Sequence, residues 1–150
     1  MDNITISIEQ MRQLKEYGID TSKASMVLIV TDNDGNELGW DDVEEEFAHP
    51  DPIYMNYNYH YADSLYYDHS YREDCGVFTL QDIIELLPKE IKAGTDVFRL
   101  TMFVIGEMWT VCYSMSDEFD YYKEFESESL INAAYKMLCW CAENGYLEQQ

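Results

Sequence analysis

The chain has 150 residues, 47% of them hydrophobic and 15% aromatic, so it can form a sizeable core and is unlike a disordered protein. It carries 30 Asp and Glu but only 9 Lys and Arg, which gives a formal net charge of -21 at pH 7. Because nucleic acids and anionic membranes are bound through Lys and Arg, this charge argues against direct binding to either and favours basic partners or cations.

The sequence shows neither a secretory leader nor a membrane-spanning run. Residues 1–5 lack the basic and apolar regions of a signal peptide, and the longest apolar run, Met26–Val30, is too short to cross a bilayer. We therefore expect a soluble, cytoplasmic protein with reduced cysteines and no membrane partner. Cys139 and Cys141 are two residues apart on an expected helix, so their thiols should point to opposite sides rather than form a ligand pair.

The first part of the chain predicts a helix followed by two strands. Ser7 and Gln10 have the spacing of a capping box, and the helix that they begin should cover residues 8–17 and end at Gly18. Residues 26–30 are apolar throughout and predict a buried strand. The Asp-, Asn- and Gly-rich turn that follows indicates that residues 37–40 return antiparallel to it.

Another strand is predicted over residues 53–61, where the side chains alternate with period two. One side is apolar and aromatic, with Ile53, Met55, Tyr57, Tyr59 and Tyr61. The other side carries Tyr54, Asn56, Asn58 and His60. Such alternation is typical of a half-buried strand.

The second half predicts a helix and a hairpin. Thr79 and Asp82 can cap a helix that ends near Pro88, because proline disfavours helical geometry in the residue before it. Residues 97–105 and 108–113 then form a hairpin, and Gly at the first position of its two-residue turn suits type II′.

A last helix should begin near Ser127 or Ser129, with acidic residues 124, 126 and 128 at the positive end of its dipole, and should end at residues 144–145. No Gly/Ser-rich linker divides the chain. The order of elements predicts one α+β domain over residues 1–150, with a single antiparallel sheet of four to five strands and about three helices packed on one face.

Two segments carry a resemblance to a known group of proteins. They are the run Phe78–Ile91 and the helix Ser129–Tyr146, with a Trp-containing hairpin between them. Together they resemble small uncharacterised proteins of prophages and mobile elements of gut bacteria. The resemblance covers the C-terminal half and more loosely the first helix and strand. It implies an accessory or host-interaction role and brings no catalytic residues with it.

The candidate binding surface is the acidic, tyrosine-rich segment before the second half. No Lys or Arg occurs between Lys23 and Arg72, whereas eleven acidic residues do, and seven of the 13 tyrosines lie between Tyr54 and Tyr71. Tyrosines are favoured anchors in interfaces, and acidic side chains favour a basic partner. The candidate binding residues are Asp41, Asp42, Glu44, Glu45, Glu46, Tyr54, Tyr57, Tyr59, Tyr61, Tyr66 and Tyr67.

These features favour a non-enzymatic, acidic protein-binding accessory factor whose partner is a protein, with a basic one best suited to the charge. The alternative is a nucleic-acid mimic, in which carboxylates take the place of phosphates and inhibit a host DNA- or RNA-binding protein. Neither reading requires a cofactor.

A second alternative is a metal-dependent enzyme that uses the segment 49–69. His49, His60 and His69 lie there among aspartates, and His with carboxylates is a ligand set for zinc or iron. Their spacing matches no established pattern, so they are weak candidates and no metal site is predicted.

The Asp-rich turn at 32–36 lacks the ligand spacing of a calcium loop. Cys75 has no positive charge nearby to lower its pKa and make it a nucleophile.

Overall fold

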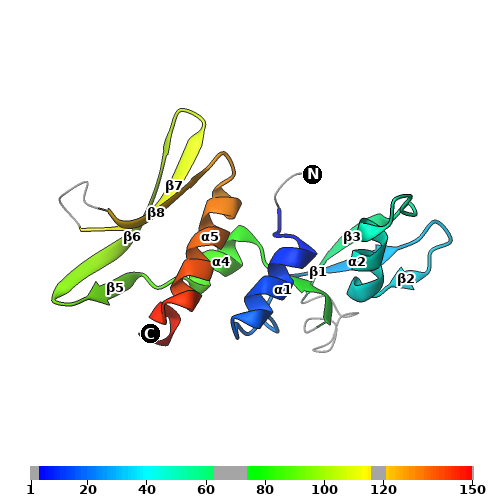
Figure 1. Ribbon diagram of the computed structural model, residues 1–150, viewed down its shortest axis with the longest axis horizontal. Coiled ribbons are helices and arrows are strands. Elements are labelled where there is room, and N and C mark those ends of the chain that lie inside the picture. The colour runs from blue at the N-terminus through cyan, green and yellow to red at the C-terminus, as the bar shows by residue number, and fades with distance from the viewer. Residues whose placement is uncertain (1–3, 63–73, 116–120, 150) are drawn as a thin grey trace.

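The computed structural model describes residues 4–62, 74–115 and 121–149 (Figure 1). This part of the chain is α+β, with four α-helices and two antiparallel sheets of four strands each. The elements are α1 (Ile8–Glu16), β1 (Met26–Thr31), β2 (Glu37–Leu38), α2 (Trp40–Ala48), β3 (Asn56–Tyr61), β4 (Gly76–Val77), α4 (Leu80–Leu86), β5 (Glu90–Ala93), β6 (Asp96–Ile105), β7 (Met108–Ser114), β8 (Tyr121–Ser127), α5 (Leu130–Glu143) and a final 3₁₀ turn, η1 (Tyr146–Gln149).

The first sheet is built around the buried strand β1. β3 pairs antiparallel along the whole of one edge of β1, whereas the short strands β2 and β4 pair with opposite ends of β1. Leu28 lies opposite Tyr59, and Val30 lies opposite Tyr57, so these four side chains share one face. Leu28 and Val30 belong to the buried core on that face, together with side chains of α1 and α2.

The sequence predicted β1 and its turn but not α2. The returning strand ends at Leu38, and Trp40 begins a helix instead. Asp41 and Asp42 lie in the first turn of this helix, where negative charge favours the positive end of the dipole. The predicted strand 53–61 begins only at Asn56, because Asn56 already lies opposite Thr31, the last residue of β1.

The second sheet has the order β5-β6-β7-β8, and α5 packs on its β7 and β8 strands and against α4. The predicted β6–β7 hairpin is confirmed, with Gly106 at a φ of 61° in its turn. Strands β5 and β8 were missed. Glu124 and Glu126, expected just before the last helix, are exposed residues of β8, and Ser129 caps α5.

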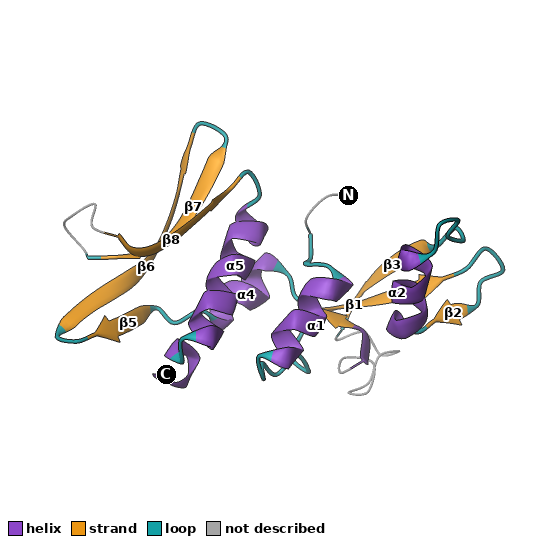
Figure 2. Cartoon of the chain, in the orientation of Figure 1, coloured by secondary structure: helices purple, strands orange, loops and turns teal. Residues whose placement is uncertain are grey.

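The prediction of one sheet with three helices on one face was therefore wrong in detail, although the α+β class is confirmed. The chain reaches the second sheet through α4, and β5–β8 pair only with one another. Figure 2 shows helices lying between the two sheets. No local pattern in the sequence states which strands pair, because pairing is decided by contacts between distant segments.

Helices α1 and α5 lie side by side and join the two halves. Near their first turns, Gln10 Nε2 donates to Asn132 Oδ1 at 3.2 Å, and near their last turns the Tyr17 hydroxyl donates to the Glu143 carboxylate. Between these contacts the fully buried side chains of α1 and α5 belong to one continuous core. Within the described ranges, no helix is both long and apolar enough to cross a membrane.

Buried polar contacts fix where α4 meets the first sheet. The Asp82 carboxylate accepts hydrogen bonds from the amides of Ser25 and Thr79, at 2.9 and 3.0 Å, and from the Ser25 hydroxyl. Asp82 and Thr79 also form the predicted capping box. Since Ser25 directly precedes β1, one carboxylate caps α4 and anchors the entry to β1.

Tyr113→Phe tests a buried hydrogen bond of the second sheet. The Tyr113 hydroxyl donates to the carbonyl of Pro88 at 2.7 Å, and both residues are buried. The variant leaves this carbonyl without its donor, so we expect the free energy of unfolding to fall by about 1–3 kcal/mol in urea denaturation.

Tyr54→Phe is the matched control, because Tyr54 is 66% exposed and should lose less than about 0.5 kcal/mol. Equal stability of the Tyr113→Phe variant and the wild type would show that the buried bond contributes nothing.

Candidate functional site

A groove of about 510 Å³ opens on the first sheet between α1 and α2. The start of α1 forms one wall, α2 forms the other, and β1 and β3 form the floor. Its lining residues are Ser7, Ile8, Glu9, Leu28, Glu44, Phe47, Tyr57 and Tyr59.

The floor of the groove is apolar because of the register between β1 and β3. Leu28 and Tyr59 lie directly opposite each other and point to the side on which both helices lie. Ile8 is buried beside them at the start of α1. Tyr57 lies further along β3, is 42% exposed, and has its pKa raised first by burial and then by Tyr59. A tyrosine hydroxyl is neutral at physiological pH even at its ordinary pKa of about 10, so Tyr57 can donate a hydrogen bond.

The α2 wall combines an acid with an aromatic ring. Glu44 and Phe47 are three residues apart and therefore lie on one face of the helix, above the buried Val43. Phe47 is 56% exposed, so its ring is available for contact with a partner. The wall thus offers apolar surface beside a carboxylate.

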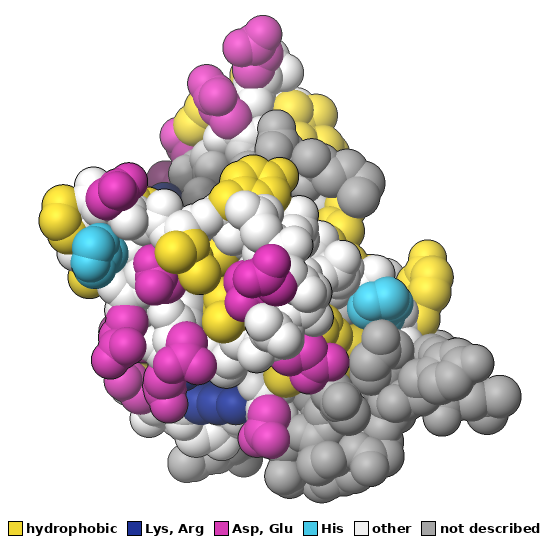
Figure 3. All heavy atoms as spheres, turned by 90° about the vertical axis from the view of Figure 1, so that its right-hand side faces the viewer, with side chains coloured by type: hydrophobic (Ala, Val, Ile, Leu, Met, Phe, Trp, Pro, Cys, Tyr) yellow, Lys and Arg dark blue, Asp and Glu magenta, His cyan; other side chains and the backbone are white. Residues whose placement is uncertain are grey.

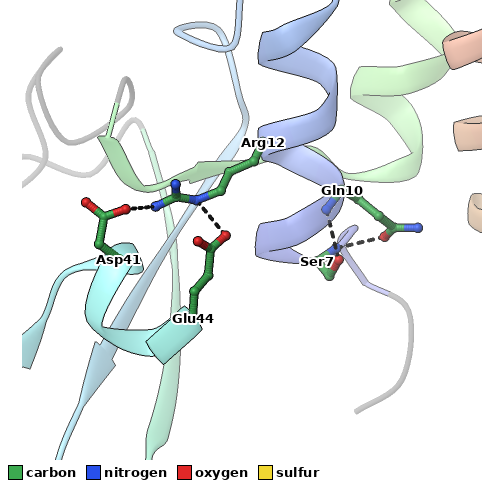
Figure 4. A network of polar contacts seen from close by, with 5 residues as sticks. All are labelled: Ser7, Gln10, Arg12, Asp41 and Glu44. Carbon is green, nitrogen blue, oxygen red and sulfur yellow. Dashed lines mark hydrogen bonds and ion pairs between the residues drawn. The ribbon is translucent and has the colours of Figure 1, made fainter. Parts of the chain in front are cut away.

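Arg12 holds this wall against α1 (Figure 4). Its Nη2 atom donates to Asp41 Oδ1 at 2.8 Å, and its Nε atom lies 2.9 Å from Glu44 Oε1. The second contact is an ion pair whose N–H direction does not meet hydrogen-bond geometry. One guanidinium thus spans two carboxylates on successive turns of α2.

The remaining acids of α2 have different surroundings. Glu46 accepts a hydrogen bond from the Ile53 amide at 3.1 Å and so fastens the loop before β3. The carboxylates of Asp42 and Glu45 make no ion pair or hydrogen bond within the described part of the chain. On this end of the molecule, Figure 3 shows acidic side chains distributed around apolar ones, with few basic side chains in view. Glu9 and Glu44 line the groove itself, one on each wall, so its rim is acidic.

The structure brings some of the predicted residues together and separates others. Glu44, Tyr57 and Tyr59 line the groove, and Asp41 meets Arg12 beside it. Tyr54 precedes β3, and Tyr61 ends it, 72% exposed and paired with Met26. Tyr66 and Tyr67 lie outside the described residues.

Sequence reasoning missed several residues of the groove. Ser7, Ile8 and Glu9 are far from α2 in the chain, so no local signal could assign them to the same site. Phe47 could have been noticed as the aromatic ring at helical spacing from Glu44, had residues 40–48 been read as a helix. Arg12 was treated only as part of a helix.

The two described histidines, His49 and His60, give no support to a metal site. His49 ends α2, and its Nδ1 accepts from the Asp51 amide at 3.2 Å. His60 lies on the other face of β3 from the groove tyrosines, opposite Val27. His69 is outside the described residues. Among the residues that the structure describes, no three His, Cys, Asp or Glu side chains lie close enough to hold a metal ion.

Two other candidate groups have structural surroundings. The Asp32 carboxylate accepts from the amides of Asp34 and Asn36, and these hydrogen bonds, that from Asn36 above all, lower the pKa of Asp32. The Asp32 carboxylate thus closes the turn by accepting these hydrogen bonds. Cys75 is half-buried, and burial, followed by the charge of Asp74, raises the pKa of its thiol. The expectation of no positive charge nearby was wrong, because Lys15 acts on the thiol, but its lowering effect on the pKa is smaller than these. The upward shift is opposite to what an activated nucleophile needs.

Arg12→Gln tests whether one guanidinium positions the acidic wall. Removing it leaves Asp41 and Glu44 without their cation, so we expect a loss of up to about 1 kcal/mol in the free energy of unfolding at low salt. Arg99→Gln is the matched control, because it removes the same charge but breaks a longer, more exposed contact of 3.5 Å with Glu90. It should cost less.

The difference between these two variants should shrink in about 0.5 M NaCl, because salt screens exposed charges. Equal losses for both variants at low salt would mean that Arg12 acts only through net charge.

No protein-family model, curated protein or solved structure matches this chain. The resemblance of the C-terminal half to prophage proteins stays a prediction, and the residues of the groove carry the functional proposal.

Proposed function

We propose that this chain is a non-enzymatic, protein-binding accessory factor, and that a protein partner docks at the groove between α1 and α2. The observation that carries the proposal is the exposure of Phe47 and Tyr57 beside an apolar floor and an acidic rim. Large aromatic side chains are enriched in interfaces because they bury much area at little conformational cost. The acids would steer a complementary partner toward the same place.

The groups at the groove are suited to binding rather than to chemistry. Two carboxylates, two tyrosine hydroxyls and a capped helix start line an otherwise apolar surface. The four thiols are free, and burial raises the pKa of each. A role in recognition uses the groups that line the groove, whereas nucleophilic catalysis would need a thiol with a lowered pKa.

The nucleic-acid mimic remains the alternative function. In that case the exposed acids of α2 would enter a basic cleft of the partner, and Phe47 would contribute little. A hollow, apolar site favours the first proposal because it receives a side chain, whereas a mimic presents charge on a projecting surface. A prophage or mobile-element origin fits either role.

Capture of partners from a bacterial lysate, followed by mass spectrometry, separates the two roles. With the proposed function, the proteins retained by the wild type should be lost with Phe47→Ser and retained with Ile105→Ser. Ile105 is the control because it is 73% exposed, on the distant β6–β7 turn. Raising salt should weaken capture in all cases because it screens the acidic rim.

Two outcomes would contradict the proposal. If the Phe47→Ser variant captures the same proteins as the wild type, the groove is not the docking site. If these proteins are nucleic-acid-binding proteins that nucleic acid displaces, the mimic is the better reading.

A further inference from the structure

We infer that the groove accepts a short basic segment of its partner, in which one apolar side chain lies between Lys or Arg residues. This inference rests on the proposed function and adds the chemical class of the partner. It follows from three features of the groove: its charge, its apolar floor and the free amides at the start of α1.

Most charged side chains around the groove are negative. α2 alone carries five acids, Asp41, Asp42, Glu44, Glu45 and Glu46, and Glu9 adds another from the opposite wall. Arg12 balances part of this charge through Asp41 and Glu44. Glu9 lines the wall at α1 and Glu44 lines the wall at α2, so these two carboxylates stand on opposite sides of the hollow. A bound segment with cations on both sides of its centre would meet one of these acids at each side.

The floor requires an apolar group at the centre of the segment. Leu28 and Ile8 are buried, and Tyr59 and Phe47 border the space above them. A polar side chain placed there would lose its water without gaining a partner, whereas an aliphatic or aromatic one would replace unfavourable hydration of both surfaces. A purely cationic chain therefore matches the rim but not the floor.

The start of α1 adds donors that suit a peptide backbone. The capping box bonds the amides of Ser7 and Gln10, at 2.9 and 3.1 Å. The amides of Ile8 and Glu9 have no intrahelical acceptor, and neither makes a hydrogen bond within the described residues. Both residues line the groove. A carbonyl of an extended segment can accept from these amides, whereas a protonated amine has no acceptor to offer them.

A second copy of this chain is a poorer occupant. Its most exposed apolar tip, at Ile105, is followed two residues later by Glu107, which the acidic rim would repel. Two chains with a net charge of -21 each also repel one another as they approach. A basic segment of another protein meets neither obstacle.

Binding of a labelled peptide, Gly-Lys-Lys-Leu-Lys-Lys-Gly, to the full chain tests the inference by fluorescence polarisation. The same peptide with Ser in place of Leu has equal charge and reports diffuse attraction. We expect the Leu peptide to bind the wild type at least about tenfold more tightly, as burial of one leucine side chain implies. The difference should disappear with Phe47→Ser and persist with Ile105→Ser.

Charge variants separate the rim from the overall field. Glu9→Gln and Glu107→Gln remove the same charge, one at the groove and one on the distant hairpin. Glu9→Gln should weaken binding of the Leu peptide several-fold more than Glu107→Gln does. In NMR spectra of the wild type, the amide signals of Ile8 and Glu9 should shift with the Leu peptide more than with the Ser peptide.

Equal binding of the Leu and Ser peptides to the wild type would overturn the inference, and this comparison needs no variant to fold. The proposed function would still stand if lysate capture is lost with Phe47→Ser. If the Phe47→Ser variant captures the same lysate proteins as the wild type, but the Leu peptide binds more tightly than the Ser peptide, the proposed docking function is wrong. The inferred preference of the groove for a basic segment with an apolar centre then still holds.

Discussion

The core shared by α1 and α5, with one polar contact near each end of the helix pair, joins the two halves of the structure. Each sheet is covered by the helices of its own half. The buried side chains of α1 and α5 belong to one core that spans both halves. Met11 and Leu14 of α1 are fully buried, as are Met137 and Leu138 of α5. Burial of each such side chain stabilises the fold by roughly 1.5–3 kcal/mol. Polar contacts at both ends of the helix pair then define how the helices lie.

A strongly acidic chain can fold in this way because its charge lies outside that core. Within the described residues, Asp82 is the buried acid, and its carboxylate has three donors from Ser25 and Thr79. The few cations are used locally: Arg12 pairs with α2, and Lys15 lies 5.7 Å above the ring of Trp40. Both residues extend from α1 toward α2. They therefore reduce repulsion where the acids are densest, and they leave the outer acids of α2 to solvent or to a partner.

The groove is a consequence of the same arrangement. α1 shares a core with α5 and lies at the end of the first sheet that faces α5, whereas α2 lies at the opposite end (Figure 1). The two helices do not close over β1 and β3, so Leu28 and Tyr59 remain at the bottom of a hollow. Packing thus places an apolar floor inside an acidic rim. That combination, rather than acidity alone, is what suits the groove to a basic segment with an apolar centre.

The sequence by itself determined the helix caps and the hairpin, because each depends on residues that are close together in the chain. Ser7 with Gln10 and Thr79 with Asp82 form capping boxes, Ser129 caps α5, and the β6–β7 hairpin follows from its turn and its alternating side chains. Each of these depends on residues at most a few positions apart, or on one two-residue turn. The tyrosine face of β3 was likewise visible as a period of two.

Only the tertiary structure decided that two sheets form instead of one, that residues 40–48 are helical, and that Ser7–Glu9 meet Glu44 and Phe47. Helix propensity, which is higher for Glu than for Asp, is only a weak prior that tertiary context can override, and strand pairing is set by burial against distant partners. The acidic segment could therefore be recognised in the sequence as a surface. Its groove could not, because half of the residues that line it come from α1 and β1, which are distant in the sequence from α2 and reach it only through tertiary packing.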